Sequence, residues 1–373
     1  MTVSSPCDEI DSAKYGELND KSRTRLCSEE VRSGMKAMVL NKISSVEEKP
    51  LELVDLPEPI PGEGQILVRV SACGVCHTEL DEIEGRVAPS RFPMILGHEI
   101  VGRVAALGPG ASKFRKGDRV GIAWINWACG GCSFCLRGEE NLCETAKWTG
   151  KDVHGGYAQY TAVSEDFAYS IPDRFTDAKA APLLCAGVIG YRALRLSSMR
   201  DSGTLGLYGF GASAHIVIQV AKHKYPNGKV FVFTRPHQTE HQALARQLGA
   251  DWIGATEDTP PDKLDSAIDF TPVGIPVREA LRNLQKGGRL AINAIRKTTP
   301  IPELDYTEHL WYEKEIKSVA NVTRRDAQEF LPLAAQIPIV PEIQEFRLEE
   351  ANQALILLKE GKMHGAGVLR ITE

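Results

Sequence analysis

The sequence lacks the features of a membrane protein, a nucleic-acid-binding protein or a secreted protein. No apolar run reaches the roughly eighteen residues needed to span a bilayer. The formal net charge of −5 comes without any block of Lys and Arg, so nucleic acid is not an expected partner. Residues 1–34 have no apolar centre of the kind found in secretory signals. We interpret them as an N-terminal extension with no part in the chemistry.

Internal repeats and low-complexity tracts are also missing, and the composition is that of an ordinary globular protein. The 373 residues exceed the size of one ordinary hydrophobic core, and two domains are therefore expected. The chain has nine cysteines. Without a secretory signal, they favour a reducing, cytoplasmic compartment, in which thiolates bind metal rather than pair as disulfides.

The order of the expected elements divides the chain into two regions. Up to about residue 175, short strands such as Ile66–Val70 and Asp118–Ile122 alternate with turns, which predicts a largely antiparallel β domain. From about residue 188, strands alternate with helices, which predicts βαβ units and a parallel sheet. The expected strands there are Thr204–Tyr208, Val230–Phe233, Ala267–Phe270 and Arg289–Ile292, with helices at Ala212–His223, Glu240–Leu248 and Val277–Leu284 between them, and helices at Ala327–Ala335 and Leu348–Glu360 and a strand at Gly367–Ile371 after them.

Four cysteines within fifteen residues form the most specific motif: Cys129, Cys132, Cys135 and Cys143. An isolated Cys-x2-Cys pair can arise by chance, but two such pairs in phase and a fourth cysteine nearby are typical of a metal site. Four close sulfurs saturate a tetrahedral ion and leave no position for a substrate. The spacing therefore predicts a structural zinc that stabilises one lobe of the chain.

A second group of possible metal ligands is scattered along the chain, at Cys76, His98 and Cys185. Three ligands from distant segments leave a fourth coordination position open, as catalytic zinc requires. Burial in the core is the alternative, because a lone His or Cys in an apolar context is more often core than ligand. If the three residues bind zinc, Thr78 would pass a proton between the substrate oxygen and solvent. Glu99, next to a ligand, would shape the field of the metal or enter its inner sphere.

The run Gly209-Phe-Gly211-Ala-Ser-Ala214 follows an expected strand and opens an expected helix, as dinucleotide-binding turns do. Gly209 permits the tight turn, Gly211 lets the backbone approach a pyrophosphate, and the small Ala214 lets the helix pack against the strand. Glycine-rich turns also occur for packing reasons alone. The βαβ setting favours coenzyme binding.

The carboxylate that usually binds the ribose 2′-hydroxyl, about twenty residues after such a turn, is missing. The next expected strand ends in Phe233-Thr234-Arg235. A hydroxyl and a cation can accept a 2′-phosphate, so Thr234 and Arg235 favour NADP(H), with NAD(H) still possible. The alternative is that Arg235 is a solvated loop residue without a coenzyme contact.

Together these motifs resemble those of zinc-dependent alcohol dehydrogenases of the medium-chain dehydrogenase/reductase superfamily, from about Met35 to the C-terminus. The resemblance implies an α/β protein with a GroES-like, β-rich catalytic domain at 35–187 and 322–373. It implies a Rossmann-fold coenzyme domain, a doubly wound parallel sheet, at 188–321. It also implies catalytic zinc on the scattered trio, with His77 near the coenzyme pyrophosphate. Trp124 matches an aromatic wall of the alcohol pocket, although simple packing is an equal alternative.

The family pattern is incomplete at several positions. Asp81 stands where many members end the proton relay with a His, and Ile189 stands where they often have a Thr beside the nicotinamide. Glu79 replaces the usual Asp, as a carboxylate that can orient His98. An Arg that often contacts the pyrophosphate near the C-terminus is absent from Gly365–Gly367. These differences bear on rate and coenzyme preference rather than on the reaction class.

The resemblance implies reversible oxidation of primary or secondary alcohols to aldehydes or ketones, with hydride transfer to NAD(P)⁺ and two zinc ions per chain. A polyol or amino-alcohol dehydrogenase on the same scaffold is one alternative, and a non-catalytic coenzyme-binding relative is another. The short span between Cys143 and His154 resembles that of compact members of the family. This implies a homotetramer, with a dimer as the next expectation.

Overall fold

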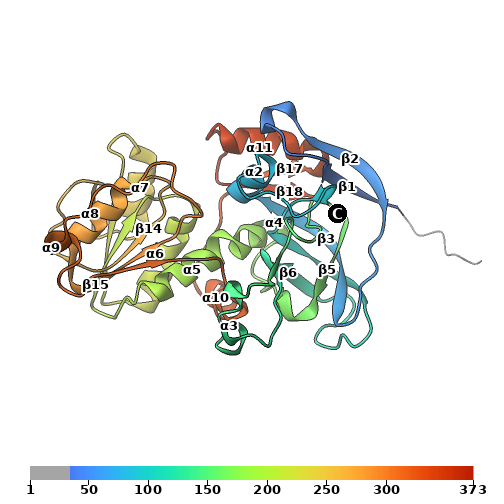
Figure 1. Ribbon diagram of the computed structural model, residues 1–373, viewed down its shortest axis with the longest axis horizontal. Coiled ribbons are helices and arrows are strands. Elements are labelled where there is room, and N and C mark those ends of the chain that lie inside the picture. The colour runs from blue at the N-terminus through green and yellow to red at the C-terminus, as the bar shows by residue number, and fades with distance from the viewer. Residues whose placement is uncertain (1–33, 373) are drawn as a thin grey trace, which may run out of the picture.

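The computed structural model describes residues 34–372, which form two parts with helix α5 (Ala186–Leu196) between them (Figure 1). The N-terminal extension predicted at 1–34 lies outside the described residues, together with Cys7 and Cys27, except for its last residue. That residue, Gly34, begins strand β1 (Gly34–Leu40).

The first part is rich in antiparallel strands. A seven-stranded sheet is built around β3 (Gln65–Val75), which pairs on one side with β5 and on the other with β18, close to the C-terminus. The C-terminal segment therefore returns to the sheet of the N-terminal half. The strands of this part are β1, β2 (Leu51–Pro57) and β4 (Met94–Ile95) in one sheet; β10 (Ala168–Ser170), β6 (Arg119–Ile122), β5 (Ile100–Leu107), β3, β18 (Ala366–Arg370), β17 (Ile343–Arg347) and β9 (Tyr160–Ser164) in the second; and β7 (Ile125–Trp127) with β8 (Lys147–Trp148) in a third.

The second part is a six-stranded sheet in which every neighbouring pair is parallel. Its strand order reverses between β11 and β14, as in the doubly wound dinucleotide-binding fold. Ligands of such sheets bind beyond the carboxyl ends of the strands at this reversal. In order across the sheet, the strands are β13 (Trp252–Ala255), β12 (Lys229–Thr234), β11 (Thr204–Tyr208), β14 (Leu264–Asp269), β15 (Leu284–Ile292) and β16 (Glu315–Ser318).

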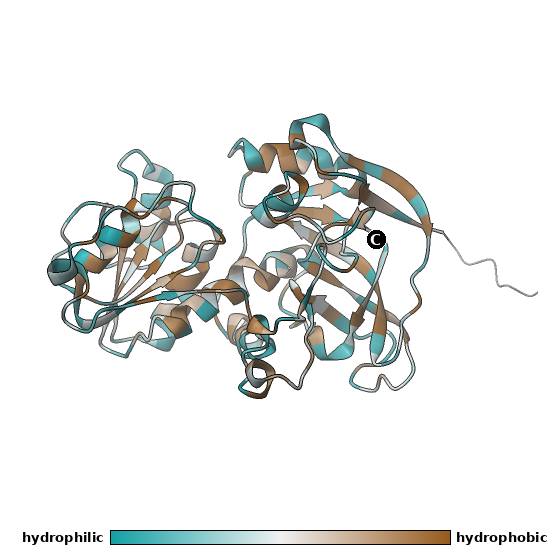
Figure 2. Cartoon of the chain, viewed as in Figure 1, coloured by the Kyte–Doolittle hydropathy of each residue, from teal (hydrophilic) through white to brown (hydrophobic). Residues whose placement is uncertain are grey.

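The central strands of the parallel sheet are almost entirely buried because both of their faces are covered. All five residues of β11 are buried, and in β12 only Lys229 is exposed. The rings of Tyr208 and Phe233 stack between these strands, with centroids 4.0 Å apart. Figure 2 shows hydrophobic residues on the strands of both parts and hydrophilic residues in many of the surrounding loops.

Helices cover the sheets and connect the two parts. Thr323 caps α10 (Arg324–Gln336) together with Asp326, whose buried carboxylate also binds Arg192 and Arg195 of α5. This ion-pair cluster attaches the C-terminal segment to the helix between the two parts. The remaining helices are α2 (His77–Ile83), α3 (Ser133–Leu136), α4 (Asp177–Ala180), α6 (Ala212–Lys224), α7 (Thr239–Gln247), α8 (Ile275–Asn283), α9 (Tyr306–His309) and α11 (Ala351–Lys359), with 3₁₀ turns η2 (Val46–Glu48), η3 (Glu140–Leu142), η4 (Glu165–Phe167), η5 (Ala181–Leu184) and η6 (Leu348–Glu350).

The predicted fold class is confirmed, since a β-rich part accompanies a doubly wound parallel sheet. The strands and helices expected after residue 188 are all present, with ends that shift by one to a few residues. The outer strands β13 and β16 were not expected. The domain limits at 187/188 and 321/322 remain predictions.

Candidate active site

Three chain segments bring the scattered metal ligands together. Cys76 follows β3 and is the N-cap of α2, His98 lies between β4 and β5, and Cys185 lies between η5 and α5. Each ligand is therefore placed where a strand or helix begins or ends. Such positions are held by the elements on either side, which suits a site that must keep its geometry.

The ligand atoms of Cys76, His98, Glu99 and Cys185 all lie within 4.8 Å of one another. The two sulfurs are 3.8 Å apart. A tetrahedral zinc ion with Zn–S bonds of about 2.3 Å separates two sulfurs by about 3.8 Å, so the observed spacing fits zinc. Two sulfurs and one imidazole nitrogen are a donor set that zinc prefers, and they leave one position for substrate or for Glu99.

Glu79 contacts His98 and fixes the orientation of its imidazole ring. Nδ1 of His98 lies 2.6 Å from Oε1 of Glu79, and both side chains are buried. The other oxygen of Glu79 accepts a hydrogen bond from the backbone N–H of Cys76 at 2.8 Å. With Nδ1 bound to the carboxylate, Nε2 of His98 is the nitrogen left for a metal.

The Glu99 carboxylate lies against the backbone of β3 at Gly74. A Cβ atom at Gly74 would stand 1.9 Å from Oε2 of Glu99, so only glycine leaves room for this side chain. Glu99 is 5% exposed and sits beside two thiol ligands. It can therefore serve as an additional oxygen ligand in place of substrate.

The two thiols of the site behave as a pair. A hydrogen bond from Cys185 lowers the pKa of Cys76 well below its ordinary value, and the same contact raises the pKa of Cys185 well above its own. Two partly buried thiolates side by side repel one another unless a cation lies between them. The pair is therefore arranged for a positively charged ion.

A cavity of about 970 Å³ connects the metal ligands with the carboxyl ends of the central strands of the parallel sheet. Thr78 lines it, and its hydroxyl lies 3.7 Å from Sγ of Cys76. Of the residues predicted for substrate or coenzyme, the cavity wall includes His77, Thr78, Glu99, Trp124, Gly209 and Gly211. The predicted residues Ala214, Thr234 and Arg235 lie outside the wall.

The glycine-rich turn has the geometry that a dinucleotide requires. Gly209 adopts φ +83°, which favours glycine, and a Cβ there would meet Thr271 at 2.9 Å. Gly211 is the N-cap of α6 and supplies no side chain, and the space where its Cβ would stand is open. The first N–H groups of a thirteen-residue helix thus face the cavity, as pyrophosphate binding needs. Ala214 is fully buried, in agreement with a packing role.

Thr234 and Arg235 differ in exposure at the end of β12. Thr234 is buried, and its hydroxyl accepts a hydrogen bond from Gln242 at 3.1 Å. Arg235 is exposed, and only its backbone is held, by Gln238 at 3.3 Å. The Arg235 guanidinium is thus the more accessible of the two groups for a 2′-phosphate.

Asp81, at the position where relatives often carry a relay His, is engaged in ion pairs. Its buried carboxylate contacts Arg86 of its own part and Nε of Arg296 at 3.3 Å. Arg296 follows β15, so this contact joins the two parts of the molecule. Ile189, the apolar replacement for a Thr, lines the cavity.

The four-cysteine lobe also has metal-binding geometry. The four sulfurs lie within 4.8 Å of one another, and those of Cys129 and Cys135 are 3.9 Å apart. A hydrogen bond from the backbone of Cys129 lowers the pKa of Cys143 to about 6, so one thiolate is present at neutral pH. Four sulfurs around one centre leave no open position, and the lobe fits structural zinc.

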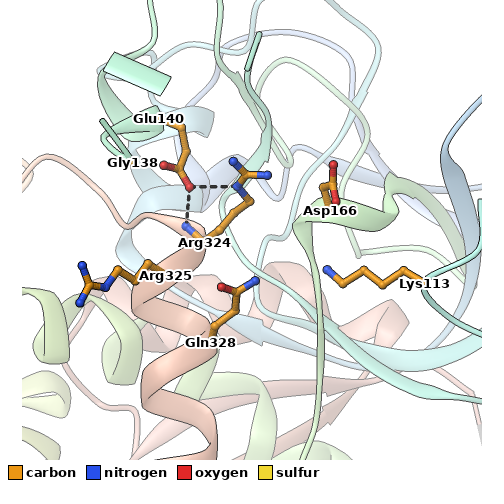
Figure 3. A pocket seen from close by; sticks show the side chains of 7 residues that line it. All are labelled: Lys113, Gly138, Glu140, Asp166, Arg324, Arg325 and Gln328. Carbon is orange, nitrogen blue, oxygen red and sulfur yellow. Dashed lines mark hydrogen bonds and ion pairs between the residues drawn. The ribbon is translucent and has the colours of Figure 1, made fainter. Parts of the chain in front are cut away.

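The lobe is attached to the C-terminal segment by Glu140 of η3. Its carboxylate accepts hydrogen bonds from the backbone N–H of Arg324 at 2.8 Å and from its guanidinium at 3.1 Å, as Figure 3 shows. Asn141, next to it, donates to the carbonyl of Ala320 at 2.6 Å and lines the active-site cavity. Through Glu140 and Asn141, the lobe is therefore in direct contact with the C-terminal segment and with the cavity wall.

If the lobe binds zinc, replacement of Cys143 by serine is expected to lower the thermal midpoint by roughly 5 °C or more, because the lobe would lose one of the four ligands of that ion. Differential scanning calorimetry together with zinc analysis measures both quantities. An unchanged midpoint with one zinc fewer per chain would show that the lobe does not depend on its ion.

Residues 62–173 match the family described as alcohol dehydrogenase GroES-like domain. Over 342 residues the chain is 44% identical to a probable alcohol dehydrogenase, AdhA, of Mycobacterium tuberculosis (strain CDC 1551 / Oshkosh), a match that covers 90% of this chain and 97% of that protein. The chain belongs to the alcohol dehydrogenases of the medium-chain dehydrogenase/reductase superfamily.

Other members of the superfamily match over most of their length. An alcohol dehydrogenase of Geobacillus stearothermophilus is 35% identical over 350 residues, covering 91% of this chain and all of that protein. Among solved structures, acetophenone reductase from Geotrichum candidum NBRC 4597 in complex with NAD has a TM-score of 0.77 and 26% identity, covering 91% of this chain and 98% of that one. Within residues 34–372, this alcohol dehydrogenase has no helix with the length and apolarity needed to cross a membrane.

Several residues of the cavity wall, Trp148 among them, were not predicted from the sequence, and neither was the burial of Glu82. Trp148 of β8 lines the cavity beside Trp124. Glu82 is fully buried on α2, three residues after Glu79, and burial raises its pKa well above the ordinary value. The spacing of three residues, which places two acidic side chains on one face of a helix that begins at a metal ligand, is the signal that could have indicated Glu82.

Proposed function

We propose that this protein oxidises primary or secondary alcohols to aldehydes or ketones, reversibly, with zinc and NAD(P)⁺ as cofactors. The observation that carries the proposal is the group of Cys76, His98, Glu99 and Cys185 at one end of a cavity whose other end is the Gly209–Gly211 turn. One cavity thus joins a site for a metal to a site for a dinucleotide. The relatives named alcohol dehydrogenases support the same reaction class.

Each cofactor would be held by residues already described. Cys76, His98 and Cys185 would hold the catalytic zinc, and the four-cysteine lobe a structural one. The N-terminus of α6 and His77 would hold the pyrophosphate. When bound, zinc supplies a Lewis acid for the alcohol oxygen, and the nicotinamide supplies the hydride acceptor.

The side chains around the metal ligands would manage the proton and the substrate. The Thr78 hydroxyl, on the cavity wall beside Cys76, would accept the proton of the alcohol and pass it outward. Glu79 would keep His98 in the orientation that presents Nε2. Trp124 would bound the alcohol and exclude water, since its ring lies 6.1 Å from that of His98.

A direct test measures the absorbance of reduced nicotinamide with purified protein, several alcohols and either coenzyme. Turnover that is abolished by a chelator and restored by zinc would support the proposal. Absence of turnover in both directions with both coenzymes, for protein that contains two zinc ions per chain, would reject it.

NADP(H) is the coenzyme that we propose, because Arg235 is exposed at the end of β12 and no carboxylate stands in the Phe233-Thr234-Arg235 run to repel a phosphate. Because the solved acetophenone reductase is in complex with NAD, the coenzyme preference of this protein has to be measured. Replacement of Arg235 by Asp is expected to shift the ratio of kcat/KM for NADP⁺ over NAD⁺ by roughly tenfold or more toward NAD⁺, because a carboxylate repels the 2′-phosphate and accepts the 2′-hydroxyl. Initial rates with both coenzymes measure this ratio, and an unchanged ratio would contradict a role for Arg235.

We further propose a cytoplasmic location and a homotetramer, with a dimer as the next expectation. The seven cysteines within the described residues are all free thiols, as a reducing compartment allows and as metal binding requires. Analytical ultracentrifugation of the zinc-loaded protein measures the assembly, and a monomer at micromolar concentration would contradict it.

A further inference from the structure

One ion pair runs from the β-rich part of the molecule to the loop that follows β15. Nε of Arg296 lies 3.3 Å and 3.4 Å from the two carboxylate oxygens of Asp81. Asp81 belongs to α2, and Arg296 lies in the loop between β15 and α9. The two residues are 215 positions apart in the chain, so no short connection holds them together. The contact therefore depends on how the two parts sit against one another.

The loop that contains Arg296 lines the cavity with its first residues and is fixed to the parallel-sheet part by its later ones. Residues 293–295 belong to the cavity wall, directly after β15. Residues 297–299 bind the segment that follows β14, as in the hydrogen bond from the N–H of Thr298 to the carbonyl of Pro272 at 2.6 Å. Arg296 is thus the point at which a loop anchored on the coenzyme side reaches the β-rich part.

Helix α2, on the other side of this ion pair, also contributes to the cavity wall. His77 and Thr78 line the cavity, and Asp81 follows Thr78 by three residues, about one turn of the same helix. The ion pair therefore ties together two segments that both help to enclose the cavity. Because the coenzyme would lie in that cavity, a tie between these segments resists its release.

Asp81 has a second cationic partner, which belongs to its own part of the molecule. Arg86 also pairs with the Asp81 carboxylate. The Asp81 side chain is 3% exposed, whereas that of Arg296 is 43% exposed. Loss of the only cation beside a buried carboxylate is strongly destabilising. With Arg86 in place, Arg296 can move into solvent while the carboxylate keeps one partner, so the tie can open and close at small cost.

We propose that Arg296 is a positioning residue that holds the 293–299 loop against α2 through Asp81, and that this ion pair slows the release of the coenzyme. The proposal rests on the proposed function, and it concerns a step that the metal ligands do not control. Arg296 lies outside the cavity wall, so its effect is expected on coenzyme release rather than on hydride transfer.

Stopped-flow fluorescence of the reduced nicotinamide measures coenzyme release without any alcohol present. Arg296→Ala is expected to raise the dissociation rate constant of the reduced coenzyme by roughly tenfold, with two zinc ions retained. Arg296→Lys keeps the charge without the planar guanidinium, and its rate constant is expected to lie between the two. The rate constant of the wild type is expected to rise with ionic strength, and that of Arg296→Ala to rise less, because salt screens an exposed ion pair.

Arg86→Ala is the matched control, because it removes the other cation from the same carboxylate. Arg296 then remains as the cation that compensates Asp81, so the tie is harder to open. Coenzyme release is therefore expected to be slower than in the wild type, by roughly twofold or more. General damage to this region would speed release in both variants. Faster release in both, or a rate constant for Arg296→Ala equal to that of the wild type, would overturn the proposal.

Coenzyme release and alcohol turnover are measured separately, so the two proposals can fail separately. If release responds to the variants as expected but no alcohol is oxidised with either coenzyme, the proposed function alone is refuted. If alcohols are oxidised but release is equally fast in all variants, this inference alone is refuted. A protein that binds neither coenzyme would refute both.

Discussion

Replacement of Cys185 by serine is expected to lower kcat/KM for alcohol oxidation by at least about a thousandfold, because a Lewis acid contributes several kcal/mol of charge stabilisation and each 1.36 kcal/mol is a factor of ten. Sγ of Cys185 lies 3.8 Å from that of Cys76, and no other thiol of the described chain joins this ligand set. Serine places a much weaker ligand at the same position. The zinc content, measured by metal analysis, is therefore expected to fall from two ions per chain to one.

Cys73, three residues before Cys76, provides a control for this experiment. Cys73 is fully buried in β3, and burial raises its pKa well above the ordinary value, so it stays a protonated core thiol. Cys73→Ala is expected to keep both zinc ions and most of the activity. A Cys185→Ser protein with full zinc content and activity within a few-fold of the wild type would show that this thiol is not a ligand.

Replacement of Thr78 by valine is the second large effect, with an expected loss of roughly 10²–10³ in kcat and little change in bound zinc. Valine keeps the shape of threonine and removes the hydroxyl that would take the proton of the alcohol. Thr78 is 8% exposed, and its hydroxyl has Sγ of Cys76 as a neighbour at 3.7 Å. No other hydroxyl among the cavity-lining residues has a recorded contact with a member of the metal-ligand group.

Thr78→Ser is the matched variant, because it restores the hydroxyl without the methyl group. It is expected to recover most of the rate, and its pH profile should resemble that of the wild type. Steady-state kinetics over a range of pH compares the three proteins. If valine and serine variants had the same rate as the wild type, the proton would have to leave by another route.

The fold could be predicted where the sequence pattern has one physical cause. Buried runs such as β11 and β12 indicate parallel strands because both faces are covered, and both were expected. The edge strand β16, Glu315–Ser318, is exposed along its whole length and carries charges, so no hydrophobic pattern indicated it. The outer strand β13 has only four residues, all of them half-buried, so no alternation of buried and exposed positions indicated it.

The site could be predicted where the motif itself specifies the chemistry. The spacing of the four cysteines predicts a tetrahedral metal site, and the Gly209–Gly211 pattern predicts a tight turn at the start of a helix; the structure agrees with both. The prediction that Glu79 can orient His98 agrees with the 2.6 Å contact between Oε1 of Glu79 and Nδ1 of His98. Two features that depend on tertiary placement could not be predicted: the space that Gly74 leaves for Glu99, and the burial of Glu82. Each of these joins segments whose proximity is decided by packing rather than by local sequence.

The most direct test of the proposed chemistry follows deuterium from a carbinol-deuterated alcohol to the coenzyme in a single turnover, by mass spectrometry of the reduced nicotinamide. Zinc-loaded protein is expected to transfer one deuterium per active site, metal-depleted protein none, and zinc-reconstituted protein one again. Equal transfer by the loaded and the depleted protein would contradict the proposed role of a metal ion at Cys76, His98 and Cys185.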